Sequence, residues 1–345
     1  MKAVVLTGIR QMKIKDIPEP IITDNRDVLI KVSRIGVCGS DVHYYASGRI
    51  GSQVVNYPFT VGHEMSGIVM ETGSAVSKLR PGDRVAIDPA LSCWKCDQCL
   101  AGRHHTCREL KFLGCPGQAE GALSEYIVMP ESSCYPVPEN LDMDQAVISE
   151  PLAIGLYAIL KSEITGDNKI GILGFGPIGM SVFLSARYNN VKDIYITDRV
   201  DERLNIAVKS GASYAGNPDK TNIVKEILNK EPLQLDAVFE CCGKQEAVDQ
   251  AIDLLKPGGK LMVIGIPDFN RWSFSVDKTR RKEITIQNIR RQVDCTKLAL
   301  DLIAEDKINV SQMITHHYRF EDTEKAFELV SNYKDGVMKA IVEFE

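Results

Sequence analysis

The chain has 345 residues, of which 44% are hydrophobic and 25% charged, and its formal net charge at pH 7 is −5. This composition is that of a globular protein of about two domains, which excludes a disordered, collagen-like or coiled-coil chain. The acidic balance offers no basic face for nucleic acid or an anionic membrane, so we expect neither as a partner. No uninterrupted apolar stretch approaches a membrane span, and the first residues read as a strand, so we expect a cytoplasmic protein.

The first 150 residues are rich in glycine, proline and short β-branched runs. Their alternating patterns predict strands at 28–32, 67–70, 83–87 and 126–129, separated by long loops. We therefore expect a mostly β domain at the start of the chain.

From Pro151 onward, strand and helix patterns alternate. The predicted strands are 169–173, 194–197, 236–240, 260–264 and 283–289, and the predicted helices are 178–189, 201–210, 223–228 and 245–255. Alternation of this kind predicts a parallel sheet with right-handed crossovers, and hence an α/β fold. From about residue 291 the pattern becomes helix, loop, helix and a final strand at 339–344.

A glycine-rich turn follows the strand 169–173 directly. It has the pattern G-x-G-x-x-G, it precedes a helix, and Asp198 ends the next strand. The first glycine permits the tight turn, the second lets a pyrophosphate approach, and the third lets helix and strand pack closely. The expected cofactor-binding residues are Gly174, Gly176, Pro177, Ile178, Gly179, Asp198 and Arg203. The alternative is a structural turn that binds nothing.

The choice of dinucleotide depends on the residues beyond the turn. Asp198 can accept hydrogen bonds from the ribose hydroxyls, which favours NAD. Arg199 and Arg203 lie close to it and can accommodate a 2′-phosphate, so NADP is the alternative. Both arginines can equally be solvated helix charges.

Four cysteines form the sharpest local motif, C-x2-C-x2-C-x7-C, at Cys93, Cys96, Cys99 and Cys107. Four thiolates at this spacing can close around one tetrahedral zinc, which leaves no open position and makes such a site structural. An iron–sulfur cluster is the competing interpretation, because it is also held by four cysteines.

A second set of potential zinc ligands is spread along the first domain. Cys38, His63, Glu64 and Glu150 supply thiolate, imidazole and carboxylate groups, a mixture typical of catalytic zinc. Their spacing alone does not join them.

The chain resembles zinc-dependent medium-chain alcohol/polyol dehydrogenases, and most of all the microbial sorbitol/xylitol dehydrogenases. The resemblance spans essentially the whole chain. It is carried, in family order, by Cys38-Gly39-Ser40-Asp41, His43-Tyr44-Tyr45, the motif from Gly62 to Gly67, the 93–107 lobe, Glu150-Pro151 and the 174–179 turn. It implies a GroES-like catalytic domain of residues 1–150 and 291–345, a Rossmann domain of residues 151–290, and a homotetramer.

The resemblance also implies roles for single residues. Cys38 and His63 match ligands of the catalytic zinc. Glu64 matches a ligand of the polyol branch or one that approaches when water leaves, and Glu150 is expected to contact zinc directly or through water. Ser40 matches the hydroxyl that takes the substrate proton, and His43 the outer end of that relay. Tyr44 and Arg290 match positions that contact the polyol.

The implied function is oxidation of a secondary alcohol of a polyol to a ketose, with two zinc ions and NAD per chain. Zinc polarises the alcohol, Ser40 and His43 remove the proton, and NAD takes the hydride. A second arginine beside Arg290, at Arg291, leaves a sugar acid, a sugar-alcohol phosphate or L-threonine as alternative substrates. A non-enzymatic NAD(H) sensor and a zinc-free relative of the quinone reductases are weaker alternatives, because the ligand sets are intact.

Overall fold

The computed structural model describes residues 1–344, and the chain divides into two compact units. Unit 1 comprises Met1–Glu150 and Thr296–Glu345, and unit 2 comprises Pro151–Cys295. The expected division placed the second boundary at residue 290. The structure keeps the next residues with unit 2, because Ile289 still donates a backbone hydrogen bond to Val263 of that unit's sheet and the next helix begins only at Cys295.

Unit 1 is built on a seven-stranded sheet. Its order is β11-β7-β6-β3-β19-β18, and β10 pairs with the first half of β3. The strands of unit 1 are β1 (Lys2–Gly8), β2 (Gln11–Asp16), β3 (Asp27–Gly36), β4 (Arg49–Ile50), β5 (Gln53–Val54), β6 (Glu64–Thr72), β7 (Arg84–Ile87), β8 (Ala90–Leu91), β9 (Lys111–Phe112), β10 (Tyr126–Pro130), β11 (Cys134–Pro136), β18 (Ile314–Arg319) and β19 (Lys339–Glu343). The last strand of the chain thus joins the sheet of the first 150 residues, since β19 pairs with β3.

The register of this sheet brings three distant segments together. Gly36, the last residue of β3, pairs with Glu64 on β6 and with Ile341 on β19. Val28, Ile30 and Val32 alternate along β3 and point into a single hydrophobic core. Because that core demands one face of the strand, the register cannot slip by one residue.

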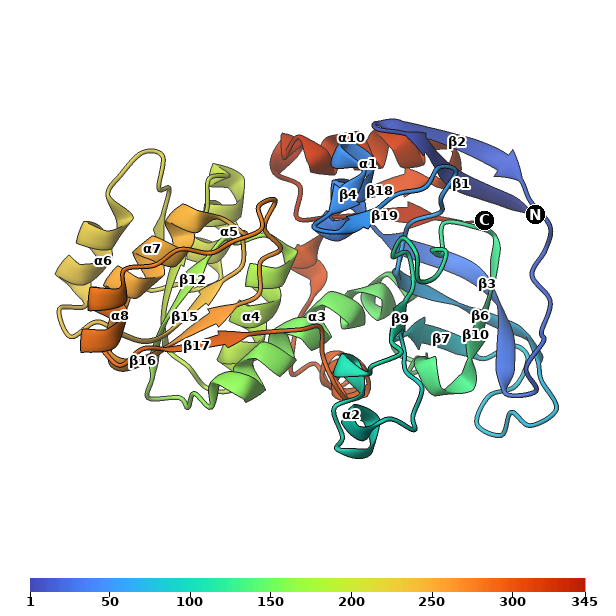
Figure 1. Cartoon of the computed structure of the whole chain (residues 1–345), viewed down its shortest axis with the longest axis horizontal. Coiled ribbons are helices and arrows are strands. Elements are labelled where there is room, and N and C mark those ends of the chain that lie inside the picture. The colour runs from blue at the N-terminus through green and yellow to red at the C-terminus, as the bar shows by residue number, and fades with distance from the viewer. Residues whose placement is uncertain (345) are drawn as a thin grey trace. The chain divides into compact units, whose positions relative to one another are not determined.

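Helices of unit 1 flank the sheet and its loops. They are α1 (Gly39–Ser47), α2 (Asp97–Leu100), α9 (Cys295–Ala304), α10 (Thr323–Ser331), and the short 3-10 helices η1 (His104–Thr106), η2 (Glu131–Ser133), η3 (Ser311–Met313), η4 (Phe320–Asp322) and η5 (Lys334–Gly336). Helices α1 and α10 pack against each other (Figure 1), with the rings of Tyr45 and Phe327 edge to face at 5.5 Å. This contact fixes α1, which carries several of the expected site residues.

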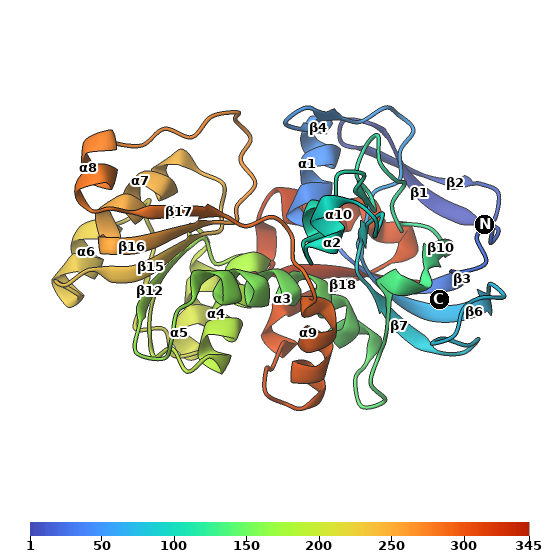
Figure 2. The same ribbon diagram turned by 60° about the horizontal axis from the view of Figure 1, so that its bottom comes forward.

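Unit 2 is a doubly wound α/β layer structure. All of its strand pairs are parallel, in the order β14-β13-β12-β15-β16-β17. Helices cover both faces, with α4 and α5 on one and α7 and α8 on the other (Figure 2). The elements are β12 (Lys169–Leu173), α4 (Pro177–Tyr188), β13 (Asp193–Thr197), α5 (Asp201–Lys209), β14 (Tyr214–Gly216), α6 (Ile223–Lys230), β15 (Leu235–Glu240), α7 (Gln245–Leu254), β16 (Leu255–Val263), α8 (Val276–Arg281) and β17 (Thr285–Asn288).

The chain order of these strands reverses direction between β12 and β15. In doubly wound sheets this switch point, at the carboxyl ends of the strands, is where ligands bind. The predicted glycine-rich turn follows β12 and therefore lies at this point. The α/β fold class is confirmed.

Several elements were not predicted, among them helices α1, α2, α3 (Met143–Ser162) and α8 and strands β2, β4, β5, β8, β9, β11, β14 and β18. For α3, α8 and β18 the reason is local. Helix α3 contains Pro151 in its interior, which normally ends a helix. Helix α8 is short, and β18 alternates half-buried and exposed residues without a strong apolar pattern. Among residues 1–344, α3 alone is long and apolar enough to cross a membrane by length and composition, but 72% of its most apolar window is buried, as in a core helix.

Candidate functional site

A buried cluster of possible metal ligands lies at the end of β3 in unit 1. Cys38 follows this strand and precedes α1, while His63 precedes β6 and Glu64 opens it. The Sγ of Cys38, a ring nitrogen of His63 and a carboxylate oxygen of Glu64 lie within 4.8 Å of one another. The sequence spacing could not show that these residues are neighbours. The sheet register brings them together, because it places Glu64 opposite Gly36, two residues before Cys38.

His63 is held by a carboxylate that comes from α1. Asp41 Oδ1 lies 3.2 Å from His63 Nδ1 and accepts a hydrogen bond from the backbone N–H of Gly62, also at 3.2 Å. Asp41 is buried, so its carboxylate has a strong need for these donors. With the Nδ1 proton directed at Asp41, Nε2 is left as the metal-binding nitrogen. Sequence reasoning assigned no role to Asp41, although its carboxylate contacts His63.

Three expected residues share one face of α1. Ser40, His43 and Tyr44 are related by three and four positions, the spacing of side chains on one side of a helix. The Ser40 hydroxyl donates to the Sγ of Cys38 at 3.4 Å, so it lies against the ligand cluster. Ser40 and His43 are half-buried.

Glu150 approaches the same cluster from α3. It is buried, and burial raises its pKa to about 7, with the carboxylate of Glu64 adding to the shift and His63 opposing it. Its oxygens are not part of the set that lies within 4.8 Å of Cys38 and His63. Within residues 1–344 the compact donor set therefore contains Glu64, and Glu150 stands beside it.

A lysine that sequence reasoning missed completes this cluster. Lys339, the first residue of β19, lies with its Nζ 2.7 Å from Glu64 Oε1 and 3.3 Å from the carbonyl of Val37. Burial alone would lower the pKa of Lys339, but Glu64 and Cys38 raise it, so the amine is charged. No local pattern identifies this lysine, because it meets Glu64 across 275 residues of chain.

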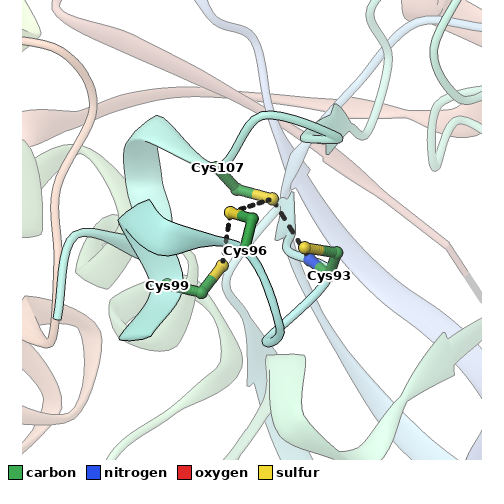
Figure 3. A group of neighbouring side chains, drawn as sticks. All are labelled: Cys93, Cys96, Cys99 and Cys107. Atoms are coloured by element: carbon green, nitrogen blue, oxygen red, sulfur yellow. Dashed lines mark hydrogen bonds between the residues drawn. The ribbon is translucent and has the colours of Figure 1, made fainter. Parts of the chain in front are cut away.

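The four-cysteine lobe folds into a compact sulfur cluster (Figure 3). Four thiolates around one zinc, each about 2.3 Å from it, stand about 3.8 Å apart. The Sγ of Cys96 lies 3.6 Å from the Sγ of Cys99 and 3.9 Å from the Sγ of Cys107, and all four sulfurs lie within 4.8 Å of one another. Backbone N–H groups of Arg108 and Cys99 lower the pKa of Cys96 to about 6, which favours the thiolate. The donor set fits a zinc ion.

The glycine-rich turn of unit 2 is as tight as its pattern predicts. Gly174 has φ +95°, and a Cβ there would lie 2.8 Å from the Cβ of Cys242 on the loop after β15. A Cβ on Gly179 would lie 2.0 Å from the carbonyl oxygen of Gly174, so only glycine lets α4 start this close to β12. Pro177 occupies the first turn of α4, and Ile178 is half-buried.

Asp198 and Arg203 both reach this turn. Asp198 Oδ2 accepts from the backbone N–H of Phe175 at 2.6 Å, and its Oδ1 accepts from Val200 at 2.8 Å. Arg203 is buried, and its Nη1 lies 3.2 Å from the position of a Cβ on Gly176. Arg199, by contrast, is engaged by Asp219 at 2.8 Å on the surface.

The two residues expected to contact substrate lie in different units. In unit 1, the hydroxyl of Tyr44 donates to Gln53 at 3.2 Å and lies 3.6 Å from the Sγ of Cys115, while Gln53 Nε2 donates to that sulfur at 2.8 Å. Gln53 and Cys115 were not predicted as site residues. Arg290 lies in unit 2, just after β17, and is exposed.

A third group of possible ligands consists of Asp144, His317 and Glu343. His317 Nδ1 lies 2.7 Å from Glu343, and Asp144 is bound by Arg34 at 2.8 Å. Since the cluster is partly exposed and already paired with an arginine, it is accounted for as a surface ion-pair network.

Two families match the chain. The family "Alcohol dehydrogenase GroES-like domain" matches residues 24–139, and the family "Zinc-binding dehydrogenase" matches residues 177–305. The first match lies within unit 1, and the second lies mostly within unit 2.

Curated relatives extend over nearly the whole chain. A sorbitol dehydrogenase of Bacillus subtilis is 33% identical over 99% of this chain and 97% of its own length. A D-xylulose reductase A of Aspergillus oryzae is 34% identical over 94% of this chain and 92% of its own length.

Solved structures share the complete fold. An oxidoreductase/dehydrogenase of unknown specificity from Escherichia coli superposes with a TM-score of 0.94 at 32% identity, covering 100% of this chain and 99% of its own. An alcohol dehydrogenase of Escherichia coli, solved with NADH, has a TM-score of 0.90 at 28% identity, and a zinc-binding dehydrogenase of Sinorhizobium meliloti, solved with NADP, has 0.89 at 29%; each match covers at least 99% of both chains. This chain belongs to the zinc-dependent medium-chain alcohol/polyol dehydrogenase family and is an oxidoreductase that uses zinc and NAD(P).

Proposed function

We propose that this protein oxidises a secondary alcohol of a sorbitol- or xylitol-like polyol to the ketose and transfers the hydride to NAD. The observation that carries the proposal is the compact donor set of Cys38, His63 and Glu64, with the Ser40 hydroxyl against it. The similarity to a sorbitol dehydrogenase and a D-xylulose reductase supports the choice of a polyol.

The donor chemistry fits a zinc ion at both clusters. Cys38, His63 and Glu64 would hold the catalytic ion, with Glu150 beside them, and Cys93, Cys96, Cys99 and Cys107 would hold the structural ion. A zinc ion bound by three protein groups polarises an alcohol oxygen and lowers the pKa of its proton. Four thiolates leave no position for substrate, so chemistry belongs to the first cluster.

The residues around the catalytic cluster orient its donors and move the proton. Asp41 holds the His63 ring through Nδ1, so that Nε2 keeps one direction. Ser40 is the group that takes the alcohol proton, and His43, whose imidazole can both accept and donate a proton, passes it towards solvent. Tyr44, anchored by Gln53 and Cys115, is the polyol-contacting group that we propose in unit 1. For Arg290 the family resemblance implies the same role.

NAD is the cofactor that we propose for unit 2, and it supplies the hydride acceptor. Gly174, Gly176 and Gly179 let its pyrophosphate approach the start of α4. We expect the carboxylate of Asp198 to repel a 2′-phosphate, which favours NAD over NADP.

The direct test is production of NADH from a panel of sorbitol, xylitol, ribitol and galactitol, with and without a zinc chelator. We expect turnover of at least one polyol that the chelator abolishes, and a lower rate with NADP. A second set of compounds, an aldonate, a sugar phosphate and L-threonine, is tested alongside, because Arg290 and Arg291 leave these substrates open as alternatives. Turnover confined to one of those compounds would reassign the substrate, and turnover unaffected by the chelator would reject the zinc mechanism.

A homotetramer in the cytoplasm completes the proposal. Its support is the family resemblance, together with ten cysteines that are all free, as expected in a reducing compartment. Light scattering of the purified protein tests the oligomeric state.

A further inference from the structure

Lys339 and Glu64 form an ion pair that is almost entirely removed from solvent. Each side chain is 1% exposed, and the Nζ of Lys339 lies 2.7 Å from the Glu64 carboxylate. It donates a hydrogen bond to Oε1, whereas Oε2, equally close, accepts none. A buried lysine with a single carboxylate partner is rare enough to require an explanation.

Stability is a poor explanation for this pair. The hydration that two buried charges lose can exceed what their attraction returns, and replacing such a pair by apolar side chains of similar volume is often neutral or stabilising. Removing only one partner is strongly destabilising, because the other charge is then left buried and uncompensated. We therefore look for the role of the pair in how Lys339 changes the chemistry of the Glu64 carboxylate.

The surroundings of Glu64 indicate that Lys339 affects metal binding by this carboxylate. The carboxylate belongs to the donor set with Cys38 and His63, so Lys339 and a metal ion compete for the same carboxylate. The backbone provides the room, since a Cβ on Gly36 would lie 2.2 Å from Glu64 Oε2. Lys339 also interacts electrostatically with Cys38 and Glu150, two further acidic groups at the cluster. Lys339 thus acts on three acidic groups at or beside the donor set, and most directly on Glu64.

We propose that Lys339 is a positioning residue that keeps the Glu64 carboxylate as its own counter-ion, so that Glu64 is a weakened, replaceable ligand and Cys38 and His63 carry the affinity for the metal. The proposal rests on the catalytic metal centre proposed above. The proposal predicts that removing Lys339 strengthens metal binding, whereas removing a residue that only supports the site would weaken it or leave it unchanged. Without Lys339, the metal is the remaining cation that can compensate Glu64, so the metal-free protein loses more stability than the loaded protein and metal binding becomes tighter.

The experiment compares metal affinity in three variants of the full chain. Lys339→Met removes the ammonium, Lys339→Arg keeps the charge, and the double variant Glu64→Gln/Lys339→Met removes both charges and keeps the volumes. The dissociation constant for Zn²⁺ is measured by competition with a chromophoric chelator, and the visible spectrum of Co²⁺ reports the donors at the site. The four-cysteine lobe is an internal reference, because its metal should be unaffected.

We expect Lys339→Met to bind the catalytic metal at least tenfold more tightly, with an altered Co²⁺ spectrum at that site alone. Lys339→Arg should stay within about twofold of the wild type, and the double variant within about threefold, since Glu64 contributes little while Lys339 holds it. A supporting role alone would lower the melting temperature of Lys339→Met without tightening metal binding.

Equal or weaker metal binding by Lys339→Met overturns the proposal. If that variant does not fold, the double variant decides, because a hundredfold loss of affinity there would make Glu64 a full ligand despite Lys339. Cys38→Ser separates this inference from the proposed function. If Cys38→Ser keeps the full complement of metal, the centre itself is absent and both fall; if it loses one ion and Lys339→Met is unchanged, this inference alone falls.

Discussion

The two candidate metal sites of unit 1 are built in opposite ways. The lobe takes four ligands of one kind from 15 consecutive residues, and short turns around α2 and η1 hold them near the surface. The buried centre takes three different ligands from the ends of β3 and β6 and is closed by groups from α1, α3 and β19. The lobe can form from local chain alone, whereas the centre exists only when the sheet has assembled. We therefore expect damage to the centre to affect chemistry and damage to the lobe to affect stability.

The largest effect on turnover is expected from Cys38→Ser. Replacing the only thiolate of the centre should reduce turnover by at least about a thousandfold, which corresponds to about 4 kcal/mol of transition-state stabilisation. Polyol-dependent NADH formation and metal content measure it, and we expect one ion per chain to be lost. Cofactor binding, followed by NADH fluorescence, should be unchanged. Full turnover would mean that the centre is not the catalytic one.

The next largest effect is expected from Asp41→Asn. The amide cannot act as the anionic acceptor for His63 Nδ1, so the ring loses its fixed tautomer and orientation. Loss of such a partner typically costs 10–100-fold in metal affinity or activity. The chelator competition assay and kcat measure this, and a melting curve shows whether the fold is intact. Activity equal to the wild type would assign Asp41 to the Gly62 turn alone.

A smaller effect on turnover is expected from Cys99→Ser. Its sulfur is buried within the lobe, so the variant should lose the lobe metal and the local fold that depends on it. We expect the segment 93–107 to become sensitive to proteases and the melting temperature to fall, while turnover at low temperature stays within about tenfold of the wild type. A loss as large as that of Cys38→Ser would remove the distinction between the two sites.

The smallest effect is expected from Arg108→Ala, the matched surface control for the lobe. Arg108 pairs with Asp97, but their side chains are 69% and 54% exposed, and solvent screens such pairs. We expect metal content, protease sensitivity and turnover to match the wild type. Loss of the lobe metal here would show that the hydrogen bond from the Arg108 backbone to Cys96 depends on the side-chain pair.

Prediction from sequence succeeded where a pattern is local. The strand 169–173 coincides with β12, and the predicted helix 245–255 differs from α7 by one residue, because both depend on short apolar periods. The four cysteines were found for the same reason. Helix α3 was missed because its interior proline contradicts helix propensity, and tertiary packing outweighs that cost.

For the buried centre too, residues within sequence motifs were identified from the sequence, and residues without such a motif were not. Cys38, His63, Glu64 and Glu150 were identified through a family resemblance, and their roles as ligands stay predictions. Asp41 sat inside a recognised motif without a role, and Lys339 had no signal at all. The contact of Lys339 with Glu64 depends on the pairing of β19 with β3, and no residue near Lys339 in the sequence indicates that pairing.

Short-range order thus specified the parallel α/β unit, the glycine-rich turn after β12 and the sulfur lobe, because each is made of neighbours in the chain. Tertiary structure alone determined the ion pair of Glu64 with Lys339, the hold of Asp41 on His63 and the exclusion of Glu150 from the compact donor set. The physical reason is that charges and ligands act over a few ångströms of space. A chain brings distant residues within that range only by burying a core that fixes the register of its strands.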